Sequence, residues 1–161
     1  MARPQLKLGL IGLGTWAGKG HLPVYLGSRL KPFVQVSALC SRNLDKARQW
    51  CAEYGIHNAY ADYSEMLRKE HLDIVAVCTP DSLHAEYVLM ALDAGAHVIV
   101  EKPLATSTEE CSRIWEKAQK TGGNVITLYH KRADPLWIEA RQIARSGAYG
   151  PLQMGWAEIS N

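Results

Sequence analysis

The sequence has no long hydrophobic run and no strong excess of either charge. No uninterrupted apolar stretch approaches the ~18 residues that a membrane-spanning helix needs. Its 18 basic and 16 acidic side chains leave a net charge of only +2, so neither a basic nucleic-acid surface nor a polybasic membrane face is expected. The opening residues also lack the apolar core and the small-residue cleavage site of a secretory signal.

Zinc-type cysteine pairs are missing as well. The four cysteines, Cys40, Cys51, Cys78 and Cys111, form no C-x-x-C pair, so the spacing of a zinc site is absent. Cys40 and Cys78 end apolar runs, where a free thiol behaves as a small buried hydrophobe. The sequence therefore predicts structural thiols in a reducing cytoplasm, with a stray disulfide or a redox role as the alternative.

What is present is the composition of a globular domain. The chain has 161 residues, of which 47% are hydrophobic and 21% are charged, which are ordinary values for one folded domain. Short apolar runs alternate with segments of helical periodicity, as in a parallel sheet covered by helices. Strands are predicted at residues 6–12, 33–40, 73–79, 96–101 and 124–129, with a weak one at 57–61. The fold class is therefore α/β, a doubly wound parallel (Rossmann) sheet with strand order 3-2-1-4-5-6.

Helix signals fill the intervals between these runs. The predicted N-caps are Asn43, Asp81 or Ser82, and Ser107 in a capping box with Glu110. A further helix is predicted near residues 134–145. After a break at residues 146–151, residues 152–159 have the pattern of a strand without an evident partner, and an unpaired edge is a liability. We therefore expect one domain over residues 1–146, and at 147–161 the start of a second, α+β domain that the chain lacks. The alternative is a strand used in self-association, which would give a homo-oligomer.

A glycine motif follows the first predicted strand. It has the form G-x-G-x-x-A and consists of Gly12, Leu13, Gly14, Thr15, Trp16 and Ala17. The first glycine permits a tight turn and the second lets the backbone approach a pyrophosphate, which the helix N-terminus then binds. Such triplets also occur in ordinary turns, but on the first of several β/α units the motif predicts a dinucleotide site. Trp16 is unusual in this loop and is a candidate to flank the cofactor.

The tip of the second predicted strand distinguishes between dinucleotides. An NAD site usually has Asp or Glu there to hold the ribose 2′-hydroxyl. Here the tip carries Ser41 and Arg42. Ser41 can hydrogen-bond a 2′-phosphate and Arg42 can pair with it in a bidentate fork. The alternative is that Arg42 stacks over adenine or points into water. The pattern favours NADP over NAD.

Two other predicted strands end in groups that suggest chemistry. Thr79 and Pro80 follow the fourth strand, with His84 one helical turn further on, and Glu101 and Lys102 end the fifth. Ligands of open α/β sheets bind beyond these carboxyl ends. His84 is equally consistent with helix capping or packing, and Lys102 without its flanking residues would be a surface lysine at a strand end. His97, inside an apolar run, is predicted to be a core histidine.

Taken together, these residues resemble the glucose–fructose oxidoreductase and inositol dehydrogenase family (Gfo/Idh/MocA). The resemblance covers the whole chain, and its most specific part is Glu101-Lys102-Pro103 after an H-V-I-V strand. It implies an NAD(P)-dependent oxidoreductase that transfers hydride to or from a sugar, cyclitol or related polyol-like substrate. It also implies that Lys102 is the catalytic residue beside the nicotinamide and that the Lys102–Pro103 bond is cis.

The implied role of Lys102 fits its chemistry. Beside oxidised nicotinamide a lysine faces a like charge, which disfavours the ammonium form, so it can accept or relay the substrate's proton. The family's second domain, which completes the substrate pocket, has no counterpart before Asn161, so we expect this chain to bind the coenzyme yet be catalytically incomplete. Two alternatives stay open: a non-catalytic dinucleotide-binding sensor, and a methyltransferase-like domain, against which Ser41 and Arg42 argue.

Overall fold

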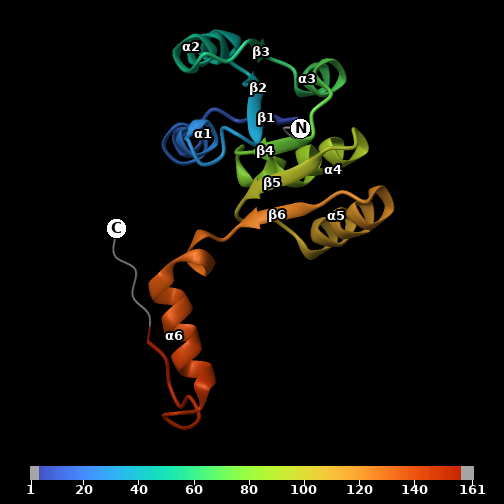
Figure 1. Cartoon of the computed structure of the whole chain (residues 1–161). Helices are drawn as coiled ribbons and strands as arrows, with labels where there is room; N and C mark the ends of the chain where they lie inside the picture. Colours follow the sequence, from blue (N-terminus) through green and yellow to red (C-terminus); the bar gives the residue numbers. More distant parts are fainter. Residues whose placement is uncertain (1–3, 157–161) are drawn as a thin grey trace. The chain divides into compact units, whose positions relative to one another are not determined.

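The computed structural model describes residues 4–156, which form two compact units, residues 4–128 and residues 129–156. The first unit contains one parallel sheet of six strands (Figure 1). The strands are β1 (Leu6–Ile11), β2 (Val34–Cys40), β3 (Asn58–Tyr60), β4 (Ile74–Val77), β5 (His97–Glu101) and β6 (Val125–Leu128). Their order is β3-β2-β1-β4-β5-β6, and every neighbouring pair is parallel. The six strands predicted within residues 6–129 and their predicted order are therefore confirmed.

Helices cover both faces of this sheet. They are η1 (Ala17–His21), α1 (Leu22–Leu26), α2 (Leu44–Tyr54), α3 (Tyr63–Glu70), the short turn η2 (Asp81–Leu83), α4 (His84–Asp93) and α5 (Thr108–Thr121). Figure 1 shows α1 and α2 on one side of the strands and α3, α4 and α5 on the other. The segment η1 is a π-helix that runs into the short α1. Gly18, Gly20 and Pro23, which disfavour a regular α-helix, account for this irregular start.

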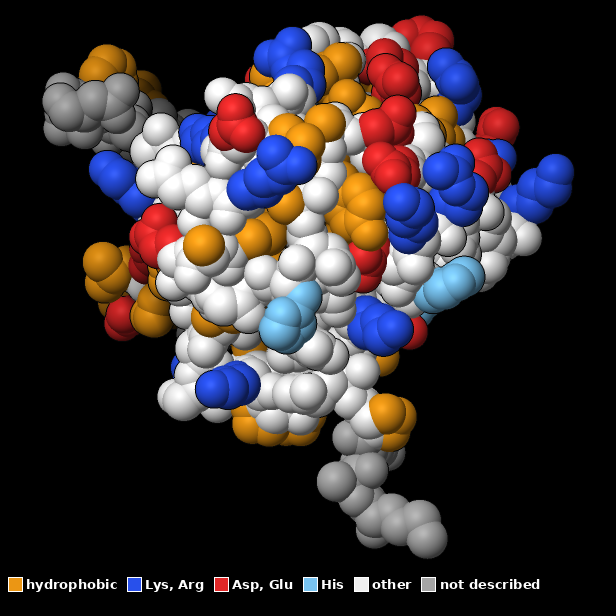
Figure 2. Space-filling view, turned by 90° about the horizontal axis from the view of Figure 1, so that it is seen from above, with side chains coloured by type: hydrophobic (Ala, Val, Ile, Leu, Met, Phe, Trp, Pro, Cys, Tyr) orange, Lys and Arg blue, Asp and Glu red, His pale blue; other side chains and the backbone are white. Residues whose placement is uncertain are grey.

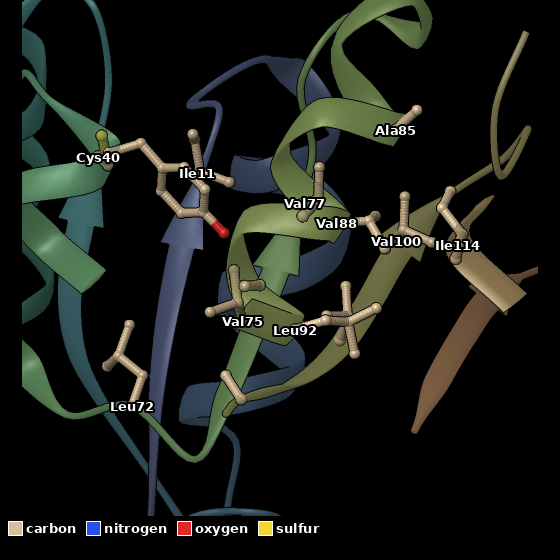
Figure 3. Packing of buried hydrophobic residues seen from close by; sticks show 14 of the residues in the cluster. Ile11, Cys40, Leu72, Val75, Val77, Ala85, Val88, Leu92, Val100 and Ile114 are labelled. Atoms are coloured by element: carbon tan, nitrogen blue, oxygen red, sulfur yellow. The ribbon is translucent and has the colours of Figure 1, made fainter. Parts of the chain in front are cut away.

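Each face of the sheet has its own hydrophobic core, because successive residues of a strand point to opposite faces. Leu8 and Leu10 of β1 pack in the core under α1 and α2. Val75 and Val77 of β4 pack on the other face against Val88 and neighbouring residues of α4, as Figure 3 shows. Burying one such side chain stabilises the fold by about 1.5–3 kcal/mol. The central strands are thus held on both faces, which fixes the positions of the loops at their carboxyl ends.

The predicted caps of α2 and α5 are present. Asn43 Oδ1 accepts a hydrogen bond from the Lys46 backbone N–H at 3.0 Å, and Ser107 Oγ accepts one from the Glu110 N–H at 3.1 Å. The return contact of the capping box differs from the expectation, because the Glu110 carboxylate accepts from the backbone N–H of Thr106.

The predicted cap of α4 is wrong. Asp81 and Ser82 lie in the turn η2, closed by a hydrogen bond from the Leu83 N–H to the Pro80 carbonyl at 2.9 Å, and α4 begins only at His84 with no side-chain cap. The core placement of His97 is also wrong. His97 is exposed at the amino end of β5, where its Nδ1 accepts from the Asn124 N–H at 3.1 Å.

The second unit contains the turn η3 (His130–Ala133) and helix α6 (Pro135–Ser146). Asp134 caps α6 by accepting from the Leu136 N–H at 3.0 Å, and the helix was predicted. The boundary expected at residue 146 falls inside this unit. The predicted strand is absent at residues 152–156, because a strand exists through pairing and none of the described strands pairs with them. Its remaining residues, 157–159, lie outside the described part, and self-association through this segment stays a prediction.

The surface of the described residues agrees with the near-neutral composition. On the face drawn in Figure 2, Lys and Arg side chains are interspersed with Asp and Glu. No helix within residues 4–156 is long and apolar enough to cross a bilayer.

Two thiols and two tyrosine hydroxyls that the fold shields from water make its stability sensitive to alkali. Burial raises the pKa of Cys40 and of Cys78 to about 12, with Asp62 and Glu101 adding to the respective shifts. Burial likewise raises the pKa of Tyr25 and Tyr63 well above the ordinary value. The unfolded chain loses these protons from about pH 8.5–10, whereas the folded chain keeps them. Their stabilisation is therefore complete below about pH 8.5 and is lost as the pH rises towards the folded pKa values.

We expect the free energy of unfolding to fall between pH 9 and pH 12 by about 1.4 kcal/mol per pH unit for each group ionised only in the unfolded state. Urea unfolding at pH 7, 9, 10 and 11, followed by tryptophan fluorescence, measures the fall. The Cys78→Ala variant lacks one of these groups and should show a shallower dependence. A midpoint that stays constant up to pH 11 would contradict the assignment.

Candidate functional site

A cavity of about 220 Å³ lies where β1, β2 and β4 end. Its wall includes seven of the residues that the sequence nominated: Gly12, Leu13, Gly14, Ser41, Arg42, Thr79 and Pro80. They come from three separate β/α loops, which the parallel strands bring to the same edge of the sheet. The structure therefore assembles the predicted glycine turn, the predicted tip of β2 and the predicted end of β4 around one space.

The two glycines of the turn have different physical roles. Gly12 has a φ of +90°, and a Cβ atom there would lie 2.5 Å from the carbonyl oxygen of Cys78. Only glycine fits a backbone so close to the end of β4. At Gly14 a Cβ atom would meet nothing within 4 Å. Helical backbone begins at Thr15, two residues before η1, so its first N–H groups lack intrahelical partners beside open space that suits an anion.

The tip of β2 presents polar and cationic groups to the same cavity. The Ser41 backbone N–H donates to the Tyr60 carbonyl at 3.0 Å, and its Oγ accepts from the Asn43 N–H at 3.3 Å. Arg42 is exposed, and no ion pair within residues 4–156 engages its guanidinium. The loop is thus ordered by Ser41 while the fork of Arg42 remains available to an anionic group.

Thr79 supplies an independent sign of a ligand. Its hydroxyl oxygen Oγ1 is buried and is the one buried side-chain oxygen or nitrogen among the described residues without a hydrogen-bond partner. Leaving a hydroxyl in this state costs about 1–3 kcal/mol. Because Thr79 also lines the cavity, the hydroxyl fits a polar ligand that enters there. With the open space over Gly14, it shows that these residues fit a dinucleotide.

The end of β5 holds the Lys102 turn. The Lys102–Pro103 peptide bond is cis, as expected. Lys102 is exposed, and within residues 4–156 no ion pair involves its ammonium. The Glu101 carboxylate is turned inward instead, with Oε1 2.8 Å from Nε2 of His21, and His21 Nδ1 lies 2.9 Å from the Tyr25 hydroxyl.

His84 is fully buried beneath the loops. Its Nδ1 lies 2.6 Å from the Pro103 carbonyl oxygen and its Nε2 lies 2.9 Å from the Thr79 carbonyl oxygen. Both ring nitrogens are therefore occupied by backbone oxygens, which favours the packing alternative over a direct contact with a coenzyme.

Other nominated residues lie outside the cavity wall: Thr15, Trp16, His84, Glu101 and Lys102. Trp16 is 52% exposed, and its ring lies over the backbone of Gly20.

The sequence reasoning missed four residues of this region. Tyr63 and Tyr87 line the cavity in a T-shaped pair with ring centroids 4.9 Å apart. His21 and Tyr25 hold Glu101. No local motif marks this histidine, because its partner Glu101 is 80 residues away in the sequence.

The sheet order, the glycine turn and the cavity at the carboxyl ends define a dinucleotide-binding Rossmann domain. Residues 6–129 match the GFO_IDH_MocA family model, described as "Oxidoreductase family, NAD-binding Rossmann fold". The chain therefore belongs to the Gfo/Idh/MocA oxidoreductase family, and the resemblance drawn from the sequence is confirmed.

Characterised relatives include sugar and cyclitol dehydrogenases. D-glucoside 3-dehydrogenase of Escherichia coli K12 is 30% identical over 152 residues, which cover 94% of this chain and 42% of that protein. Inositol 2-dehydrogenase of Salmonella paratyphi B is 30% identical over 152 residues, which cover 92% of this chain and 44% of that protein. The chain thus spans less than half the length of these relatives.

A solved structure shows the same fold. KijD10, a 3-ketoreductase from Actinomadura kijaniata in complex with TDP-benzene and NADP, superposes with a TM-score of 0.82 at 28% identity. The match covers 91% of this chain and 45% of that one.

The different surroundings of the two glycines give a paired prediction. We expect Gly14→Ala to leave the melting temperature nearly unchanged and to weaken dinucleotide binding by about tenfold or more, because the methyl group takes space that the diphosphate needs. Gly12→Ala should lower the melting temperature as well, since it combines a strained φ with a clash against Cys78. Thermal scans and nucleotide fluorescence titrations measure both. A Gly14→Ala chain that binds NADPH and NADH like the wild type would place the diphosphate elsewhere.

Proposed function

We propose that this protein is an NAD(P)-dependent oxidoreductase that transfers hydride between a nicotinamide coenzyme and a sugar, cyclitol or related polyol-like substrate. The observation that carries the proposal is the glycine turn opening on a cavity whose wall holds the unpaired Thr79 hydroxyl, with Lys102 at the end of a nearby strand. The relatives' names, a glucoside dehydrogenase and an inositol dehydrogenase, support the substrate class.

Each part of the site then has a task. The helix N-terminus after Gly14 binds the diphosphate, and the Thr79 hydroxyl bonds to the coenzyme near the end of β4. A nicotinamide coenzyme held by these residues would supply the hydride acceptor for a carbinol carbon, or the hydride donor for a carbonyl carbon. Lys102 moves the accompanying proton: its Nζ accepts the proton of the substrate hydroxyl during oxidation and donates one to the forming alkoxide during reduction. The exposure of this amine, and the lack of an ion pair to it from residues 4–156, support the role.

We further propose that NADP is the preferred coenzyme. Ser41 and Arg42 stand at the tip of β2, where an NAD site usually has Asp or Glu, and both line the cavity. A planar guanidinium binds a phosphate through two parallel hydrogen bonds, which a ribose hydroxyl does not reproduce. The complex of KijD10 with NADP is consistent with this preference.

Replacement of the arginine tests the coenzyme preference. Arg42→Ala should weaken NADPH binding about 10- to 100-fold, the loss expected for one charged hydrogen-bonding group, and should leave NADH affinity within about twofold. Calorimetric titration of the purified chain measures both. Arg48→Ala is the matched control, because Arg48 is exposed on α2 and pairs only with Asp45 at 3.5 Å. Equal or tighter binding of NADH by the wild-type chain would refute the preference.

Chemical protection tests the place of Lys102. We expect bound NADPH to slow acetylation of Lys102 by at least about tenfold, a difference that corresponds to roughly 1.4 kcal/mol. ADP-ribose 2′-phosphate, which lacks the nicotinamide ring, should protect it little, because the lysine lies beside the ring. Lys120 on α5 serves as the internal control in the same mass spectra. Equal protection of Lys102 by both nucleotides would show that the lysine does not lie beside the nicotinamide ring. A chain that binds neither NADPH nor NADH would refute the proposed function itself.

A further inference from the structure

Two of the three buried polar residues within residues 4–156 contact the same turn. Only His21, Ser37 and His84 are both polar and buried within residues 4–156. Both histidines bind the residues that flank Lys102: His21 meets the Glu101 side chain and His84 meets the Pro103 carbonyl. A buried polar group costs free energy unless it is paired, and these two are paired with opposite sides of one turn.

The two hydrogen bonds of the His21 ring have a defined donor and acceptor each. The Glu101 carboxylate only accepts hydrogen bonds when ionised, so the Nε2 of His21 donates to it. In the neutral ring, Nδ1 then accepts from the Tyr25 hydroxyl. Burial, with help from Cys78 and Glu101, raises the pKa of Tyr25, so its hydroxyl keeps the proton that it donates.

These hydrogen bonds determine how the Glu101 carboxylate is placed beside Lys102. Its Oε1 is bound to His21, and its Oε2 accepts the backbone N–H of Lys102 at 3.3 Å. The carboxylate therefore holds the main chain of Lys102 without an ion pair to the ammonium. The histidine stands at the end of η1, in the helical segment that follows the glycine turn, so one contact joins the diphosphate-binding loop to the lysine.

His84 holds the other side of the turn. It begins α4, directly after the loop that carries Thr79, and its ring lies between the Thr79 and Pro103 carbonyl oxygens. A carbonyl oxygen only accepts, so each nitrogen that carries a proton donates to its own loop. The ring thus spans the ends of β4 and β5.

We propose that His21, oriented by Tyr25, is a positioning residue that sets Lys102 against the nicotinamide ring, with His84 supporting the same turn from the opposite side. This inference rests on the proposed function. It goes beyond it because neither histidine lines the cavity: each contacts the backbone or side chain of a neighbour of Lys102. Buried ion pairs are often no more stabilising than apolar pairs of similar volume, so stability alone does not account for the contact between His21 and Glu101.

The experiment compares two nucleotides that differ in the nicotinamide ring. His21→Leu should weaken binding of NADPH to the full chain by about tenfold, and it should change the affinity for ADP-ribose 2′-phosphate by less than about twofold. His21→Gln keeps an N–H donor for Glu101 and should restore most of the NADPH affinity. A positioning role predicts that His21→Gln restores NADPH binding and that only NADPH binding depends on residue 21. A merely structural role predicts neither result.

Two further variants complete the test. His97→Gln changes a histidine at the opposite end of β5 and should alter neither affinity. Tyr25→Phe removes only the hydroxyl that orients His21 and should show the same split in smaller degree, which keeps the test decisive if His21→Leu does not fold. Wild-type affinity for NADPH in the His21 and Tyr25 variants, or an equal loss of both nucleotides, overturns the inference while the proposed function stands. A wild-type chain that binds neither nucleotide fails the proposed function instead.

Discussion

The rest of the site depends on the close approach of two main chains, at the turn after β1 and at the end of β4. Gly12 adopts a φ of +90°, and a Cβ atom on it would clash with the Cys78 carbonyl, so no side chain fits there. This contact lets the glycine turn and the Thr79 loop share one cavity. The two hydrophobic cores hold the strands beneath it on both faces, so the geometry of the loops follows from the packing of the sheet rather than from the loops themselves.

Most of the sheet was predictable because its strands are buried on both faces, which leaves continuous apolar runs separated by helix signals. Helix α3, by contrast, was missed although Asp62 caps it through the Glu65 N–H at 3.0 Å. Its eight residues are fewer than the roughly 11–18 over which helical periodicity is read. The core placement of His97 failed for a related reason. An apolar run does not show on which residue the strand begins, and the first residue of β5 is exposed.

The candidate site was predictable to the extent that it is built from local motifs. The glycine turn, the Ser41-Arg42 tip and the Thr79-Pro80 loop each stand at a strand end, and parallel strands bring such ends together. The contact between His21 and Glu101 has no local motif, because the two residues are 80 positions apart. It exists only once β1 and β5 lie in one sheet. Long-range polar pairs of this kind are properties of the folded chain, which explains why the sequence pointed to His84 but not to His21.

The two halves of the candidate site, the glycine turn with the tip of β2 and the Lys102 turn, differ in the polar groups that they present. In the proposed function, the anion-binding side would use backbone N–H groups, a guanidinium and open space, so its specificity would lie in charge and shape. The Lys102 side is a single exposed amine whose neighbours are fixed from below by buried rings. An amine that must gain and lose a proton works best without a permanent counter-ion, yet it needs a fixed position. A carboxylate bound to the lysine's own N–H and held away from its ammonium by His21 meets both requirements.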